Sequence, residues 1–122
     1  MRNPFLNSAA PRFIDREEIL ALARETAKRI ASENPNVSKI LLFGSFARKD
    51  YGPRSDMDLL IVLDSCDNPL RDRLSDFIKY LPAYPADVFA YTRVEIEERL
   101  TAADPFLTRA FREGIQLYPH RQ

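Results

Sequence analysis

The sequence is short of the residues that most often carry redox or acid–base chemistry. Its 122 residues include one cysteine, one histidine, three glycines and no tryptophan. The single cysteine, Cys66, excludes a disulfide within the chain and favours a reducing compartment. Because His120 is the only histidine and lies near the C-terminus, catalysis by a histidine base or nucleophile has little support. The chemistry of this chain must be sought among other side chains.

An excess of charge of either sign is also absent, since 18 basic and 18 acidic side chains give a formal net charge of zero. Long-range attraction to nucleic acid or to an anionic membrane is therefore not expected of the whole protein, and we do not expect direct nucleic-acid binding. The apolar runs are too short to span a bilayer, and residues 1–13 lack the apolar core of a signal peptide. These absences predict a cytoplasmic protein without a membrane partner.

What is present is the composition of one globular domain. Hydrophobic residues make up 45% of the chain and charged residues 30%, and 122 residues suffice for one core but not for two. Residues 1–14 contain two prolines and two asparagines without helical periodicity, which predicts a flexible N-terminal arm. Residues 15–122 are predicted to form a single domain.

Beyond the arm, the apolar spacing predicts alternating helices and strands. Pro35 ends the first helix, Ser45 and Thr92 are predicted N-caps, and Asp104-Pro105 is predicted to begin the last helix. The predicted helices cover 15–34, 45–49, 70–81, 92–100 and 104–113, and the predicted strands cover 39–43, 58–63, 87–91 and 115–118. This order predicts an α/β (α+β) domain in which a small mixed sheet is backed by helices.

Two aspartates separated by one residue lie at the start of the second predicted strand. Side chains alternate across a strand, so Asp56 and Asp58 point to the same side, close enough to share a cation. Two like charges so close together are unfavourable unless a metal ion or a proton intervenes, which favours a metal site. The alternative is an ordinary turn before a strand, in which serine and aspartate bond the local backbone.

A Gly-Ser pair at the end of the first predicted strand strengthens the metal interpretation. Gly44 allows the backbone to approach a ligand closely, and Ser45 begins a helix whose free N–H groups suit an anion such as phosphate. Magnesium prefers oxygen ligands and often binds through one or two carboxylates together with substrate phosphates. The two elements together predict a nucleotide site.

Residues 44–63, GSFARKDYGPRSDMDLLIVL, resemble the signature of the minimal nucleotidyltransferases in the DNA polymerase β-like superfamily. In that family, G-S-x-A-R-G is followed by a spacer and S-D-x-D-L. The resemblance covers roughly residues 15–118, since a first helix, a third strand bearing an aspartate and the segment FLTRAFREGIQLY are also similar. Many members of the family are encoded beside a HEPN-domain partner and act as antitoxins to it.

The resemblance implies the polymerase β-like fold and a role for each matching residue. Asp56, Asp58 and Asp87 would hold two Mg²⁺ ions, and Asp87 would also help to deprotonate the attacking hydroxyl. ATP would be the donor substrate. The residues implied to bind the nucleotide are Gly44, Ser45, Arg48 and Ser55.

Three of these positions leave an alternative open. Asp87 also fits a solvent-facing strand start, and Arg48 also fits a surface salt bridge. Lys49 departs from the family pattern, because it stands where the family has glycine. If the backbone there needs a positive φ, lysine is strained, or Gly52 takes over the turn.

The resemblance predicts an enzyme that transfers AMP from ATP to a hydroxyl of a partner protein, a HEPN-type toxin. A second hypothesis is a binding module that neutralises or scaffolds a partner by contact while its nucleotide site is weak. The expected partner is the HEPN-type toxin or, in a homo-oligomer, a second copy of the chain. A small-molecule nucleotidyltransferase, such as an antibiotic-modifying enzyme, is disfavoured because no second domain remains to form an acceptor pocket.

Overall fold

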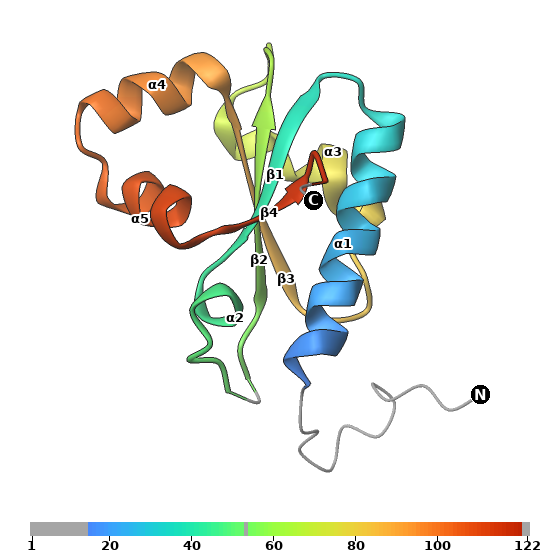
Figure 1. The fold of residues 1–122 in the computed structure, drawn as a ribbon. Coiled ribbons are helices and arrows are strands. Elements are labelled where there is room, and N and C mark those ends of the chain that lie inside the picture. Colours follow the sequence, from blue (N-terminus) through green and yellow to red (C-terminus); the bar gives the residue numbers. More distant parts are fainter. Residues whose placement is uncertain (1–14, 53, 121–122) are drawn as a thin grey trace.

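The computed structural model describes residues 15–52 and 54–120. The predicted arm, 1–14, lies outside the described residues. Figure 1 shows the elements in chain order. They are α1 (Arg16–Glu33), β1 (Val37–Phe43), α2 (Ser45–Arg48), β2 (Met57–Leu63), η2 (Leu70–Asp72), α3 (Leu74–Phe77), η3 (Ile78–Tyr80), β3 (Ala86–Thr92), α4 (Arg93–Thr101), α5 (Pro105–Glu113) and β4 (Ile115–Tyr118).

The four strands form one sheet in the order β3-β2-β1-β4. β1 pairs antiparallel with both β2 and β4, whereas β2 and β3 are parallel. The connection between the two parallel strands contains η2, α3 and η3, because parallel neighbours need a crossover rather than a tight turn. The predicted small mixed sheet is confirmed.

Helices cover both faces of the sheet, with α1 and α3 on one side and α4 and α5 on the other (Figure 1). We call the face that packs against α1 the α1 face, and the face that packs against α4 and α5 the α5 face. Alternation along β2 divides its side chains between them, so that Leu59 and Ile61 join the core of the α1 face while Leu60 and Val62 join that of the α5 face. Asp58 has the parity of the α5 face.

Local capping explains where three helices begin, and the caps at Thr92 and Asp104 are those predicted from the sequence. The Asp15 carboxylate accepts a hydrogen bond from the Glu17 N–H at the start of α1. Thr92 and Glu95 form a reciprocal capping box at the start of α4, and the Asp104 carboxylate accepts from the Leu107 N–H at the start of α5.

Two predictions of local structure are wrong. Ser45 is the first helical residue of α2, and Gly44 is its N-cap with φ 78° and ψ −155°, a conformation that favours glycine. The helix predicted over 70–81 is broken into η2, α3 and η3. Its apolar row leaves Leu70, Leu74 and Ile78 exposed, whereas Arg73 is buried.

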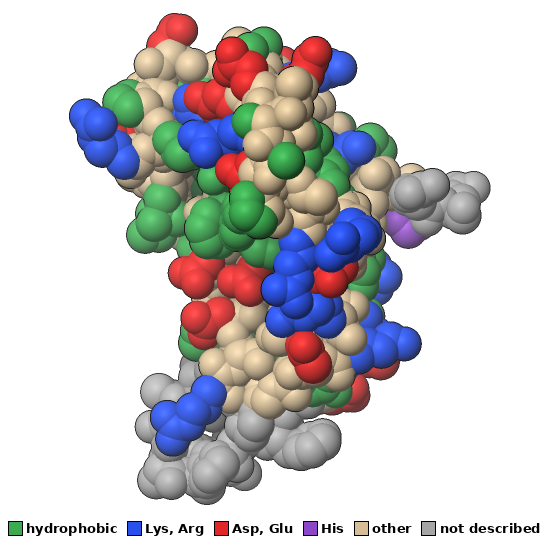
Figure 2. All heavy atoms as spheres, turned by 90° about the vertical axis from the view of Figure 1, so that its left-hand side faces the viewer, with side chains coloured by type: hydrophobic (Ala, Val, Ile, Leu, Met, Phe, Trp, Pro, Cys, Tyr) green, Lys and Arg blue, Asp and Glu red, His purple; other side chains and the backbone are tan. Residues whose placement is uncertain are grey.

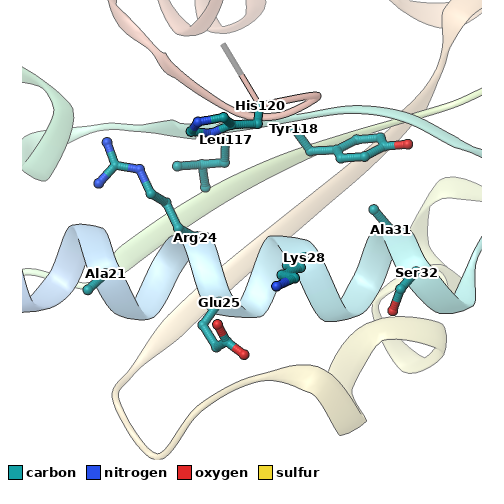
Figure 3. A pocket seen from close by; sticks show the side chains of 9 residues that line it. All are labelled: Ala21, Arg24, Glu25, Lys28, Ala31, Ser32, Leu117, Tyr118 and His120. Atoms are coloured by element: carbon teal, nitrogen blue, oxygen red, sulfur yellow. The ribbon is translucent and has the colours of Figure 1, made fainter. Parts of the chain in front are cut away.

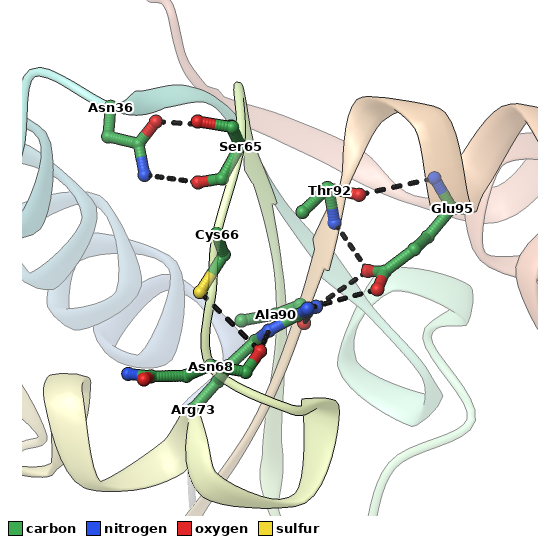
Figure 4. Close-up of polar contacts among 8 residues, drawn as sticks. All are labelled: Asn36, Ser65, Cys66, Asn68, Arg73, Ala90, Thr92 and Glu95. Atoms are coloured by element: carbon green, nitrogen blue, oxygen red, sulfur yellow. Dashed lines mark hydrogen bonds and ion pairs between the residues drawn. The ribbon is translucent and has the colours of Figure 1, made fainter.

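Arg73 gives the physical reason for the broken helix. Its guanidinium donates to both carboxylate oxygens of Glu95, at 2.6 and 2.9 Å, and to the carbonyls of Asn68 and Ala90 (Figure 4). Arg73 turns inward, and Phe77 of the predicted apolar row and Tyr80 are buried with it, while the other apolar side chains named above face solvent. A partly buried ion pair between residues 22 positions apart in sequence overrides the local periodicity.

Candidate active site

The predicted acids meet at one end of the parallel strand pair. Asp58 of β2 and Asp87 of β3 are register partners, so their side chains lie next to each other on the same side of the sheet. Asp56 precedes β2 by one residue and is exposed, as is Asp87, whereas Asp58 is half-buried. The structure therefore places Asp58 beside Asp87, and Asp56 lies near enough for its charge to act on Asp58.

The electrostatics of Asp58 reflect this crowding. Burial, followed by the negative charges of Asp87 and Asp56, raises the pKa of Asp58 from its usual 3.8 to about 6, and Arg48 partly opposes the shift. A cation placed among the carboxylates would favour the ionised form of Asp58. The three acids thus form an electrostatically coupled group at the end of the sheet.

The donor set fits Mg²⁺, which takes oxygen ligands. Within residues 15–52 and 54–120, no three His, Cys, Asp or Glu side chains are grouped as a ready-made metal cage. That arrangement is compatible with Mg²⁺, because this ion is usually bound by one or two carboxylates and by substrate phosphates rather than by an all-protein cage. The assignment of Asp56, Asp58 and Asp87 as metal ligands stays a prediction.

Gly44 has a second reason to be glycine besides its positive φ. A β-carbon at this position would overlap the Asp58 Oδ2 atom. The missing side chain of Gly44 therefore makes room for the Asp58 carboxylate on the neighbouring strand. The sequence predicted that Gly44 permits a close approach, and the group that approaches in this structure is Asp58.

A cavity of about 480 Å³ opens beside this carboxylate. Gly44, Ser45, Arg48 and Asp58 line the cavity, and α5 supplies much of the remaining lining. The residues of α5 on the wall are Pro105, Phe106, Arg109, Ala110 and Glu113. Sequence reasoning did not predict that α5 lines this cavity, because α5 begins 60 residues beyond Ser45 and its apolar spacing indicated only packing.

Arg48 and Ser55 already have partners in the structure. The Arg48 guanidinium pairs with Asp50 at 3.1 Å and Glu113 at 3.7 Å, and the hydrogen bond to Asp50 raises the pKa of Arg48. The Ser55 hydroxyl accepts from the Gly52 N–H at 2.9 Å and so closes the turn before Asp56. Contacts of either side chain with a nucleotide stay predictions.

Lys49 adopts the conformation for which the family pattern uses glycine. Its φ is 73° and its ψ is 17°, in the left-handed region, where a side chain with a β-carbon is strained. Gly52 has no positive φ and does not replace it. The sequence predicted strain at Lys49 if its backbone had a positive φ, and the structure shows that it has one.

Tyr84 is a further residue of the site that sequence reasoning missed. Its hydroxyl donates to the carbonyl oxygen of Ser55 at 2.6 Å, directly before Asp56 in the chain. Burial, followed by the negative charge of Asp56, raises the pKa of Tyr84 and keeps the hydroxyl protonated as a donor. No local sequence signal connects residues 29 positions apart.

A second cavity, of about 540 Å³, lies away from the acids between α1 and β4 (Figure 3). Arg24 and Lys28 extend from α1, and Tyr118 and His120 reach it from the end of the sheet. This cavity contains none of the predicted site residues.

No helix within residues 15–52 and 54–120 is both long enough and apolar enough to cross a membrane.

Fold and site together define a transferase that handles nucleotides. The model of the nucleotidyltransferase domain family matches residues 23–117, and the chain belongs to this family. It is 24% identical over 88 residues to a candidate protein adenylyltransferase of Methanocaldococcus jannaschii, a match that covers 72% of this chain and 83% of that protein. The resemblance to the minimal nucleotidyltransferases is confirmed.

Two solved structures are similar in fold. The crystal structure of a candidate nucleotidyltransferase from Sulfolobus solfataricus matches with a TM-score of 0.60 and 28% identity, covering 68% of this chain and 75% of that chain. The crystal structure of a toxin–antitoxin with AMP-PNP matches with a TM-score of 0.53 and 22% identity, covering 81% of this chain and 75% of that chain. The predicted nucleotidyltransferase fold is confirmed.

Proposed function

We propose that this protein transfers AMP from ATP to a hydroxyl of a partner protein, with Mg²⁺ as the metal. The observation that carries the proposal is the register pair of Asp58 and Asp87 beside the cavity that Gly44 and Ser45 line. Asp56, Asp58 and Asp87 would hold two Mg²⁺ ions, as the resemblance of residues 44–63 to the minimal nucleotidyltransferases implies. When bound, the ions would neutralise charge on the phosphates.

The residues of the chain divide the remaining work. Gly44 and Ser45 would receive the phosphates, and Arg48 and Arg109 on the wall of the cavity would balance their charge. Asp87 would accept the proton of the acceptor hydroxyl, whose oxygen bonds the α-phosphorus. The bond from that phosphorus to the bridging oxygen breaks, and pyrophosphate leaves. Positioning and charge balance carry most such reactions.

A protein acceptor is supported by the aromatic side chains next to the acids. Phe43, Phe89 and Phe106 form a mutual cluster with ring centroids 5.2 to 5.7 Å apart, and Phe106 is 39% exposed. Figure 2 shows hydrophobic side chains gathered directly beside acidic ones on this side of the molecule. Phe106 is the exposed ring of the three, and it offers a protein acceptor an apolar contact beside the acids.

The names of two similar proteins support the same assignment. One is a candidate protein adenylyltransferase, and another belongs to a toxin–antitoxin structure with AMP-PNP. We infer that the partner of this chain is a HEPN-type toxin and that modification by AMP silences it. The aromatic cluster equally suits a binding module that neutralises the partner by contact alone.

Calorimetry with Mg-ATP tests the site. Asp56→Asn and Asp58→Asn should each weaken binding at least tenfold, because each removes a negative charge that attracts the metal ion. Asp64→Asn is the matched control, since Asp64 follows the other end of β2 and pairs with Arg93 at the surface. Equal affinity in all three variants and the wild type would remove the site from consideration.

Mass spectrometry separates transfer from contact. The chain, the protein encoded beside it and Mg-ATP are incubated together, and the intact mass of the partner protein is measured. An added AMP that is lost with Asp58→Asn supports the enzyme. A stable complex without added mass supports the binding module instead.

A further inference from the structure

Tyr84 contacts both halves of the candidate site although neither half is near it in sequence. Its hydroxyl donates to the Ser55 carbonyl at 2.6 Å, and Ser55 directly precedes Asp56. The next residue, Pro85, accepts from the Met57 N–H at 2.9 Å through its carbonyl. Two consecutive residues therefore hold the backbone on both sides of Asp56.

The ring of Tyr84 reaches the other half. It meets the ring of Phe46 edge-on, with centroids 6.1 Å apart at 67°, and Phe46 in turn stacks on Tyr51 at 4.9 Å. Phe46 is fully buried, directly follows Ser45, and its carbonyl accepts from Arg16 Nε at 2.8 Å. Through Phe46, Tyr84 packs beneath the Gly-Ser turn.

We propose that Tyr84 is a positioning residue that fixes Asp56 relative to the Gly-Ser turn. The inference rests on the proposed function, because it assigns Tyr84 a role in the Mg-ATP site. Asp56 lies outside β2 and is exposed, so the sheet ladder does not by itself fix its direction. The hydroxyl of Tyr84 holds the Ser55 carbonyl inward, and Asp56 is thereby aimed at the side of Asp58.

The ring and the hydroxyl of Tyr84 have separable effects. The ring belongs to the core of the α1 face, so a phenylalanine at this position keeps the packing with Phe46. Loss of the hydroxyl frees the Ser55 carbonyl to turn towards water, and Asp56 then samples directions that do not serve the metal. A loss of ligand affinity that exceeds the loss of fold stability is the signature of positioning.

Tyr84→Phe is compared with Tyr80→Phe, which is a closely matched control. Tyr80 is also a buried tyrosine, and its hydroxyl also has hydrogen bonds, from Asn34 and to Glu33, away from the acids. Both variants should lose similar stability. By titration calorimetry, Tyr84→Phe should weaken Mg-ATP binding about fivefold, the worth of one neutral hydrogen bond, while Tyr80→Phe leaves it unchanged.

A double-mutant cycle shows whether Tyr84 acts through Asp56. In the Asp56→Asn background, Tyr84→Phe should cause no further loss of affinity, because the group that it positions is gone. A full additional fivefold loss would contradict the assignment. So would an affinity of Tyr84→Phe equal to that of the wild type.

Amide exchange in the ligand-free protein keeps the test independent of the proposed function. Tyr84→Phe should speed exchange of the Ser55 and Met57 amides, which are bonded to the Gly52 and Pro85 carbonyls, at least threefold, whereas Tyr80→Phe should not change them. Unchanged exchange in both variants overturns the positioning role. If the wild type does not bind Mg-ATP while exchange changes as expected, the positioning role is supported and the proposed function fails.

Discussion

The two faces of the sheet differ most where β2 begins. On the α1 face, Met57, Leu59 and Ile61 are fully buried from the first residue of the strand onwards. On the α5 face, the same stretch begins with the half-buried Asp58, and complete burial starts only at Leu60. One strand thus supplies an unbroken core row on one side and an open acidic end on the other.

This difference shows how a short chain combines stability with a polar site. Alternation lets β2 place apolar residues on the α1 face without regard to what the α5 face carries. The acids then cost stability only locally, through the desolvation and repulsion that raise the pKa of Asp58. The aromatic cluster of Phe43, Phe89 and Phe106 covers the sheet next to them.

The largest effect is expected from opening a cavity on the α1 face. Ile61→Ala should lower the free energy of unfolding by about 3 kcal/mol, because Ile61 is fully buried. Phe106→Ala on the α5 face should cost about 1 kcal/mol, since that ring is partly exposed. Urea denaturation of both variants checks this, and equal losses would show that the two faces are equally closed.

A smaller effect is expected from filling the space beside Asp58. Gly44→Ala should cost about 2 kcal/mol and weaken Mg-ATP binding, because alanine is strained at φ 78° and its β-carbon displaces the carboxylate. Gly52→Ala is the control, since open space surrounds that position. Urea denaturation measures the stability of both variants, and titration calorimetry measures their affinity for Mg-ATP. The prediction fails if the two alanine variants behave alike.

The smallest effect is a pair of opposite pH dependences. The raised pKa of Asp58, about 6 against the usual 3.8, means that the metal-free folded state binds the proton more tightly than the unfolded chain. Stability should therefore fall by about 1–2 kcal/mol as the pH rises from about 4 through about 6. Asp58→Asn should abolish this slope in denaturation curves measured across that range.

Glu95 should show the reverse. The hydrogen bond from Arg73 lowers the pKa of Glu95 from its usual 4.5 to about 2, so its stabilisation is present above about pH 4.5. It should be lost progressively as the pH falls towards 2, by about 1–2 kcal/mol after allowance for solvent screening. Glu95→Gln should remove that acid-side slope and leave the one from Asp58 unchanged.

The sequence predicted those parts of the fold that local signals determine. The helix after Asp15, the strands and the caps at Thr92 and Asp104 follow from periodicity and from side-chain bonds to nearby backbone. The resemblance to the minimal nucleotidyltransferases also implied that Asp58 and Asp87 act together, and the two are register partners near the starts of β2 and β3.

What the sequence did not predict depends on contacts between distant residues. The ion pair between Arg73 and Glu95 breaks the helix predicted over 70–81, and nothing near Arg73 announces it. The overlap that requires glycine at position 44 arises from Asp58 on another strand. Tyr84 and α5 likewise join the site only after folding.

The position of β1 between β2 and β4 has a consequence for synthesis on the ribosome. β2 follows β1 closely in the chain, but the partner on the other side of β1 is residues 115–118. Until that last strand has emerged, one edge of β1 carries unpaired backbone groups beside the apolar Ile40 and Leu42. A chain truncated after Gly114 should therefore expose the unpaired edge of β1 and aggregate.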